Sequence, residues 1–177
     1  MYELNFEKRD LSVKAKKIRK NGMVPCNILD GKKKETIHIQ VLDGDARKLL
    51  RDKGKGGAVS LKSSDGDNYH VIVKEIDIMS LNNQLENITF QLLNEDEYVN
   101  SFARIILRNK DLVQTMVNQL LTEIPYRSLP QDIVEEVEID LSVVKSGTGL
   151  YLKDLPIWKN DKLSIELKED TAILYIT

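Results

Sequence analysis

The sequence predicts a mainly β protein with short helices, because period-two hydrophobic patterns and β-branched residues dominate it and turn-forming residues separate them. Apolar and polar residues alternate over 36–41 and again over 87–92, as they do in strands that bury one face. Residues 69–76 are rich in β-branched and aromatic side chains. They follow the turn-forming residues 64–67, and another apolar stretch precedes that turn, so we expect a β-hairpin over 57–76.

Two short helices are expected among the strands. Asp43 is a candidate N-cap for a helix over 45–53, which a glycine-rich stretch then ends. The basic residues 12–21 predict a shorter helix, for which Ser12 is the candidate cap and Gly22 is the end signal.

The C-terminal half predicts further strands. Strands are expected at 102–107 and 133–141, and a closing pair of strands is expected at 163–167 and 172–176. The apolar residues between positions 112 and 124 are spaced as on one face of a helix, so a helix is expected there.

An acidic and polar stretch at 93–97 lies between the two halves and indicates a domain boundary. A chain of 177 residues is long enough for two small domains. We therefore expect an N-terminal domain over 1–93 and a β-rich C-terminal domain over 94–177.

Positive charge is concentrated at the start of the chain. Residues 1–34 hold ten Lys/Arg and four Asp/Glu, a balance of +6, whereas the whole chain, with 26 Lys/Arg and 28 Asp/Glu, is −2. Residues 35–177 therefore carry −8. Such segregation is typical of proteins that bind a polyanion, whereas a surface charged only for solubility mixes the two signs.

Catalytic, metal and cofactor sites are not predicted. The stretch 54–57 does not have the spacing of a phosphate-binding loop, and 65–68 lacks the closing glutamate of a calcium loop. His38 and His70 lie on expected strands as sheet-surface residues, and with Cys26 they are too few for a usual zinc site. Cys26 is expected to be an inert, partly buried thiol. The carboxylates form no recognisable set with a base, so the sequence does not predict an enzyme.

The sequence also predicts no membrane association. No apolar stretch approaches the roughly 20 residues of a membrane-spanning helix. The first residues lack the basic-then-apolar layout of a secretion signal, and a single cysteine excludes an internal disulfide framework. We expect a cytoplasmic protein with no small-molecule substrate.

The basic stretch is the strongest candidate binding site. It is nearly free of acidic residues, and further cations flank it at 8–9 and 32–34. The alternative to a binding site is a solvated helix face. Cations held on a folded surface neutralise phosphates with little information about base sequence. The candidate RNA-binding residues are Arg9, Lys14, Lys16, Lys17, Arg19 and Lys20.

Three motifs resemble one protein family. Residues 16–25, Lys-Lys-Ile-Arg-Lys-Asn-Gly-Met-Val-Pro, resemble the Arg-Arg-Leu-Arg-x-x-Gly-x-Val-Pro signature of the bacterial large-subunit ribosomal proteins that bind 5S rRNA (large-subunit protein twenty-five). Residues 129–142 and 149–156 resemble the C-terminal half of the longer, two-domain form known as general stress protein CTC. The resemblance covers most of the chain in order and spacing.

The resemblance implies a fold and a partner. It implies a six-stranded N-terminal β-barrel with short helices, which ends near residue 93, and a second β-rich domain. It implies that the barrel binds 5S rRNA within the large ribosomal subunit through phosphates and the minor groove. The resemblance further implies that four residues contact the RNA backbone: Arg9, Lys16, Lys17 and Arg19.

The chain departs from the family pattern at several positions. Leu29 stands at a tyrosine position, Asn87 and Thr89 replace a His-x-Asp pair, and Asp77 lies near a basic position. Val13-Lys14-Ala15 stands in place of a Gly-Lys-Gly stretch. These departures leave two alternatives open: weaker, mostly electrostatic binding to 5S rRNA, or a diverged stress-response or protein-interaction paralogue that keeps the fold.

Overall fold

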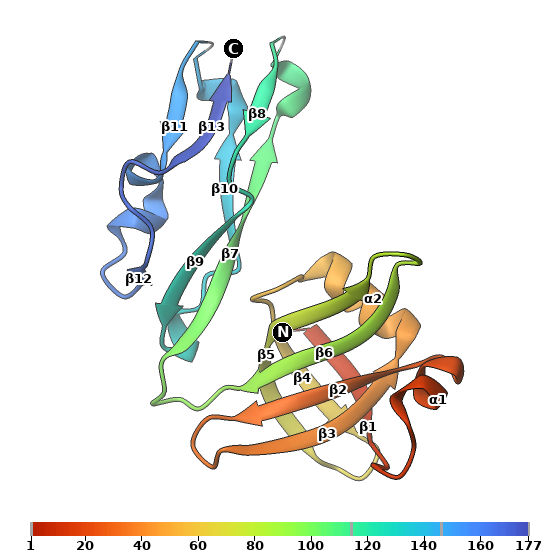
Figure 1. The fold of residues 1–177 in the computed structure, drawn as a ribbon. Coiled ribbons are helices and arrows are strands. Elements are labelled where there is room, and N and C mark those ends of the chain that lie inside the picture. The colour runs from red at the N-terminus through yellow and green to blue at the C-terminus, as the bar shows by residue number, and fades with distance from the viewer. Residues whose placement is uncertain (1, 114, 146, 177) are drawn as a thin grey trace. The chain divides into compact units, whose positions relative to one another are not determined.

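The computed structural model describes residues 2–113, 115–145 and 147–176. The chain forms two compact units, Met1–Asn94 and Glu95–Thr177 (Figure 1). Each unit has its own apolar core, and most of the regular structure in both is strand. The predicted mainly β class is therefore confirmed.

The first unit is a closed six-stranded barrel with the strand order β1-β3-β2-β6-β5-β4 in its described residues. A parallel pairing of β1 with β4 closes the barrel, and β2 lies between the antiparallel β3 and the parallel β6. The strands are β1 (Tyr2–Lys8), β2 (Met23–Asp30), β3 (Glu35–Leu42), β4 (Ala58–Ser63), β5 (Asn68–Met79) and β6 (Gln84–Leu92). The barrel confirms the architecture that the resemblance implied. The hairpin expected over 57–76 is confirmed as β4 and β5.

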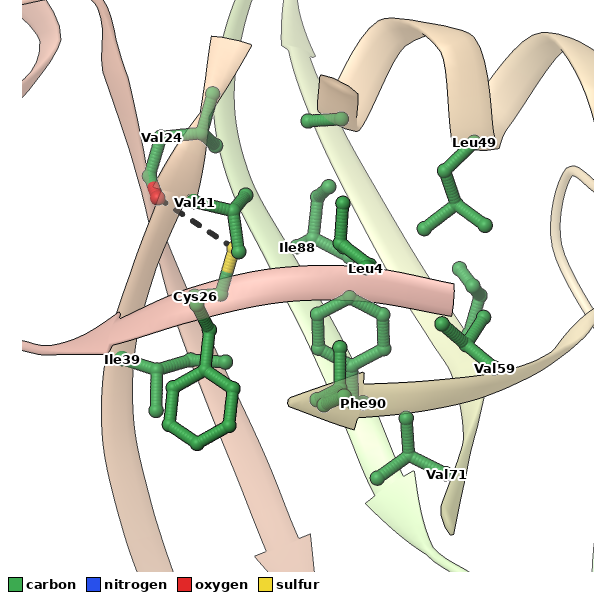
Figure 2. Packing of buried hydrophobic residues seen from close by; sticks show 14 of the residues in the cluster. Leu4, Val24, Cys26, Ile39, Val41, Leu49, Val59, Val71, Ile88 and Phe90 are labelled. Carbon is green, nitrogen blue, oxygen red and sulfur yellow. Dashed lines mark hydrogen bonds between the residues drawn. The ribbon is translucent and has the colours of Figure 1, made fainter. Parts of the chain in front are cut away.

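The barrel interior is filled by alternate residues of each strand. Figure 2 shows Leu4, Cys26, Ile88 and Phe90 clustered inside the barrel, and each of them is at most 2% exposed. The Cys26 thiol donates a weak hydrogen bond to the carbonyl oxygen of Val24, with an Sγ to O distance of 3.5 Å. Because side chains alternate between the two faces of a strand, the residues between these core positions point outward.

Two helices accompany the barrel. Helix α1 (Ala15–Lys20) packs against β2, and helix α2 (Asp43–Asp52) follows β3 without a loop. Gly22 adopts φ of +77° just after α1, and its N–H donates to the carbonyl oxygen of Arg19 at 3.1 Å, which confirms the predicted end of that helix. Ala46 and Leu49 of α2 are fully buried in the barrel core.

Both predicted N-caps are wrong. Ser12 lies before the helix, where its backbone N–H donates to Asp10 Oδ1, and the capping position is held by Lys14. Asp43 is already the first residue of α2, and its carboxylate accepts from Arg47 Nε at 2.8 Å. The Asp43 carboxylate therefore does not cap the helix. It forms an (i, i+4) ion pair with Arg47 and interacts favourably with the positive N-terminal end of the helix dipole.

The second unit contains two sheets in its described residues. Their strand orders are β10-β7-β9-β12 and β11-β13-β8. The strands are β7 (Val99–Arg108), β8 (Val117–Gln119), β9 (Glu123–Ser128), β10 (Glu136–Asp140), β11 (Gly149–Tyr151), β12 (Ser164–Ile165) and β13 (Ala172–Ile176). Single 3₁₀ turns connect them, at η1 (Lys110–Leu112), η2 (Pro130–Asp132), η3 (Leu141–Val143), η4 (Leu152–Asp154) and η5 (Pro156–Lys159).

The helix expected over 112–124 is wrong. That stretch contains β8 and the start of β9, which pair with β13 and β7 respectively. The side chains that would form the buried face of a helix, Leu112, Met116 and Leu120, are 63%, 76% and 52% exposed. Pairing with distant strands overrides the local spacing.

Two further strand predictions need correction. The strand expected over 133–141 is confirmed only at β10, since η2 and an extended segment precede it. The expected closing pair is wrong as a pair, because β12 pairs with β9 whereas β13 pairs with β11 and β8.

The Tyr126 hydroxyl anchors the chain between η2 and β10. Tyr126 is 2% exposed, and its hydroxyl donates to the carbonyl oxygen of Val134 and accepts from the N–H of the same residue, both at 2.8 Å. Burial raises the pKa of this hydroxyl above its ordinary value. Since Val134 lies outside the strands, the hydroxyl takes the place of a strand partner for both of its backbone groups.

We expect Tyr126→Phe to lower the free energy of unfolding of the second unit by about 1–3 kcal/mol, because both Val134 groups lose their partner. Trp158, the only tryptophan, packs against the second core, so its fluorescence during urea unfolding reports on this unit. Tyr98→Phe is the matched control, since Tyr98 is 53% exposed. An unfolding midpoint equal to that of the parent chain would contradict the role given to the hydroxyl.

Candidate nucleic-acid interface

Four polar residues form a row across the outer face of the barrel. His38 of β3, Asn27 of β2, Asn87 of β6 and Asp77 of β5 come from four neighbouring strands. The strand register aligns them, because Asn27 lies opposite His38 and Asn87 lies opposite Asp77. We call these four residues the polar row.

Hydrogen bonds link the polar row from end to end. Asn27 Oδ1 lies 2.8 Å from His38 Nδ1, and Asn27 Nδ2 donates to Asn87 Oδ1 at 3.3 Å. Asn87 Nδ2 donates at 3.2 Å both to Asp77 Oδ2 and to Thr89 Oγ1. Because an amide oxygen only accepts, His38 Nδ1 is the donor in its contact with Asn27 Oδ1. The row is thus a fixed line of donors and acceptors.

Arg19 reaches the polar row from α1. Its Nη1 donates to the carbonyl oxygen of Glu86 at 3.1 Å, and its Nη2 lies 4.0 Å from Glu86 Oε1. The side chain is 21% exposed, so its guanidinium is held beside β6 and does not extend freely into solvent. Glu86 directly precedes Asn87, so this cation lies next to the row.

Arg9 approaches the other end of the polar row. Its backbone N–H donates to the carbonyl oxygen of His38 at 3.1 Å, which places the residue beside β3 just after β1 ends. The Arg9 Nε atom is buried and has no hydrogen-bond partner among the described residues. Two arginines therefore flank the row, one beside β3 and the other beside β6.

The four predicted lysines lie on or just before α1. Lys14, Lys16, Lys17 and Lys20 are exposed, and the described residues give none of them an ion pair. Ile18, which is 4% exposed, is the buried residue of the helix. The helix thus displays its ammonium groups outward on a fixed backbone, as a phosphate-binding surface requires.

Lys8, a flanking cation of the basic stretch, has a different role. Its Nζ lies 2.8 Å from Asp67 Oδ2, and this partner raises the pKa of Lys8 above its ordinary value. The charged ammonium group therefore already has a carboxylate partner within the chain. The nearby Asp10 is also engaged locally, since hydrogen bonds from Ser12 lower the pKa of its carboxyl group.

The positions that depart from the family pattern fall into two groups. Asn87 and Thr89 belong to the network of the polar row, so their amide and hydroxyl groups form its bonds. Leu29 is half-buried and lies opposite Thr36 and Gln91 on the neighbouring strands, where it makes no polar contribution. Asn87 and Thr89 thus take part in a polar site on the barrel surface, whereas Leu29 does not.

Sequence reasoning missed Asn27 and did not connect His38 with the site. Period-two alternation around the buried Cys26 and Ile28 was a sufficient signal that Asn27 points outward. The cross-strand neighbours depend on the register of three strands, which no local pattern specifies. His38 is confirmed as a sheet-surface residue of β3.

Cys26 is more buried than expected. It is 0% exposed inside the barrel, and burial raises its pKa to about 12. The described residues contain no group of three or more His, Cys, Asp or Glu side chains that could hold a metal ion. Within the same residues, no helix is long and apolar enough to span a bilayer.

Comparisons with known proteins identify both halves of the chain. The family model described as Ribosomal L25p family matches residues 4–90, and the model for the C-terminal domain of ribosomal protein TL5 matches residues 106–177. The chain is 32% identical over 165 residues to large ribosomal subunit protein bL25 of Shouchella clausii, which covers 92% of this chain and 74% of the relative. It is 30% identical over 145 residues to bL25 of Lachnoclostridium phytofermentans, which covers 80% and 75%.

We expect the Cys26 thiol of the folded chain to resist a thiol-labelling reagent at pH 8, because it is both inaccessible and protonated. The same chain in concentrated urea is the matched control and should label rapidly. Absorbance of the released chromophore measures both rates. Equal rates in the folded and unfolded chain would show that the barrel interior is open to the reagent.

Proposed function

We propose that this chain, which belongs to the bL25 family of ribosomal proteins and is not an enzyme, binds 5S rRNA in the large ribosomal subunit. Its relatives are named as proteins of that subunit, and the two matched regions together span most of the chain. The observation that supports the proposal most directly is the polar row, with Arg9 beside its His38 end and Arg19 beside Glu86 of β6. The exposed lysines lie on or just before the same helix as Arg19.

The two kinds of group serve two purposes in this proposal. The ammonium groups of Lys14, Lys16, Lys17 and Lys20 neutralise phosphates, and this gives affinity without sequence information. The polar row provides hydrogen-bond donors and acceptors at fixed positions on the outer surface of the barrel. The wide, shallow minor groove of A-form RNA presents 2′-hydroxyls and base edges that such a row can contact.

Asp77 adds selectivity to the polar row. Its carboxylate only accepts hydrogen bonds, so it favours donors such as a 2′-hydroxyl and repels a phosphate placed directly over it. Arg19 instead contacts Glu86, which precedes Asn87 on β6, and it lies on the helix that carries the lysines. The proposal thus orients the RNA, with phosphates over α1 and the groove over the row.

The proposal assigns different tasks to the two parts of the chain. The domain over 1–93 is the RNA-binding barrel, and all residues of the polar row and of α1 belong to it. The β-rich domain over 94–177 supplies none of them. A large-subunit protein of bacteria works in the cytoplasm, and we propose that location for this chain.

We expect Lys16→Ala combined with Lys17→Ala to weaken binding to 5S rRNA on the order of tenfold or more near 0.15 M salt. The slope of log affinity against log salt should become shallower by about 0.9 for each phosphate that is no longer neutralised, up to about 2 in total. Filter binding over a salt series measures both quantities. Lys159→Ala with Lys168→Ala is the matched control, since both residues are exposed in the second unit. Affinity unchanged by the α1 double substitution would overturn the proposal.

We expect Asn87→Ala to reduce the preference for 5S rRNA over an unrelated duplex RNA by about fivefold or more, since removal of a hydrogen bond of about 1 kcal/mol corresponds to that factor. The salt slope should stay at the parental value, because every phosphate remains neutralised. Competition binding measures the preference, with Asn118→Ala as the exposed control in β8. A preference equal to that of the parent chain would separate the polar row from RNA recognition.

A second candidate function is a diverged stress-response or protein-interaction paralogue that keeps the fold. Two observations favour it: Leu29 has no polar group, and residues 35–177 carry a net charge of −8. Sucrose-gradient fractionation separates the two candidates. Co-migration with large subunits is expected from the first, and a free pool at the top of the gradient is expected from the second.

A further inference from the structure

We infer that the turn between β2 and β3 is a second phosphate-binding site, separate from α1, which binds another segment of the same RNA. This inference rests on the proposed function and extends it. The site consists of Lys32, Lys33 and Lys34, which we call the tip lysines. Three observations carry the inference: a turn held from inside, three cations without an ion pair among the described residues, and a position at the far end of β2.

The turn that carries the tip lysines is held by a buried carboxylate. Asp30 is 8% exposed, and its Oδ1 accepts from the backbone N–H of Lys32 at 3.0 Å and of Lys33 at 3.3 Å. An aspartate that bonds the backbone two and three residues ahead fixes the chain direction. Lys34 then adopts the left-handed conformation, with φ of 54°, and leads into β3. The lysines therefore project from a backbone of defined shape.

The tip lysines are free to bind an anion. All three are exposed, and the described residues give none of them an ion pair. Asp30, the nearest acidic residue before them, turns its carboxylate inward onto the two N–H groups. Glu35 follows them on β3 and is exposed, so the turn keeps a local excess of positive charge. Closely spaced, unpaired ammonium groups are the chemistry that neutralises phosphates.

The tip lysines lie far from α1. Helix α1 leads through Gly22 into the first residue of β2, and the turn follows the last residue, so the eight residues of β2 separate them. At about 3.3 Å per residue this strand is roughly 25 Å long. Figure 1 shows α1 and the β2–β3 turn at opposite ends of this strand. Asn27 lies midway along it, so an RNA helix that lies along β2 meets α1, then the polar row, then the tip.

The experiment compares three variants of the full chain in 5S rRNA binding over a salt series. The first replaces the tip lysines by neutral residues, Lys32→Gln, Lys33→Gln and Lys34→Asn, since asparagine tolerates the left-handed conformation. The second keeps the charge, with arginine at all three positions. The third is the matched control Lys145→Gln, Lys159→Gln and Lys168→Gln, which removes three exposed lysines of the second unit. Circular dichroism during heating checks that each variant is folded.

The neutral tip variant should bind on the order of fivefold more weakly for each phosphate that it no longer neutralises near 0.15 M salt, with a slope shallower by about 0.9 per phosphate. The arginine variant and the control should keep the parental slope. Hydroxyl-radical footprinting should show that the neutral tip variant loses protection of one set of nucleotides. The α1 double substitution should lose protection of a different set.

Two outcomes would contradict the inference, and they are distinguishable. A parental slope and footprint for the neutral tip variant, in a chain whose α1 substitutions do weaken binding, would overturn the second site alone. Absence of 5S rRNA binding by the parent chain would overturn both the proposed function and the second site.

Discussion

The register of β2 between its two neighbours is the constraint on which the rest of the barrel surface depends. It places Asn27 opposite His38 on β3 and opposite Thr89 on β6. A shift of one residue would turn Cys26 and Ile28 outward and bring Asn27 into the core, so burial of these apolar side chains fixes the register. The polar row is therefore a consequence of core packing, even though none of its members fills the core. The same strand positions α1, which precedes its first residue, and the tip lysines, which follow its last residue.

The charges follow the division into two units. Counted from the sequence, residues 1–94 hold 17 Lys/Arg and 13 Asp/Glu, and residues 95–177 hold 9 and 15, so the balances are +4 and −6. In the second unit, Arg104 and Arg108 of β7 pair with Glu136 and Glu138 of β10, each at 2.6 Å. The lysines of α1 and of the tip have no such partners in the described residues. The barrel thus combines a positive balance with two groups of exposed lysines that have no ion pair among the described residues.

The sequence predicted the features that local patterns determine. Period-two alternation located β3 and β6, β-branched residues around a turn located the β4–β5 hairpin, and Gly22 located the end of α1. The strand β1 was overlooked, although Tyr2, Leu4 and Phe6 alternate with polar residues there. The helix expected over 112–124 is wrong because β8 and β9 form there by pairing with β13 and β7, and no local pattern shows pairing with distant strands.

The candidate site was predicted only in part, for a related physical reason. The cations were visible in the sequence, and all six candidates, two arginines and four lysines, were named without knowledge of the fold. What the run could not show is that Arg19 is held against Glu86, 67 residues away, or that Lys8 is neutralised by Asp67. Nor could it show the polar row, which is assembled from four strands.

The most direct test of the central claim is an NMR titration of the full chain with 5S rRNA, observing the side-chain amide groups of asparagine. If the β2 register presents the polar row to the RNA, the amides of Asn27 and Asn87 shift together on titration while that of Asn118 in the second unit stays unchanged. Shifts confined to the backbone of α1, with both row amides unperturbed at saturation, would contradict the account, because binding would then be electrostatic only.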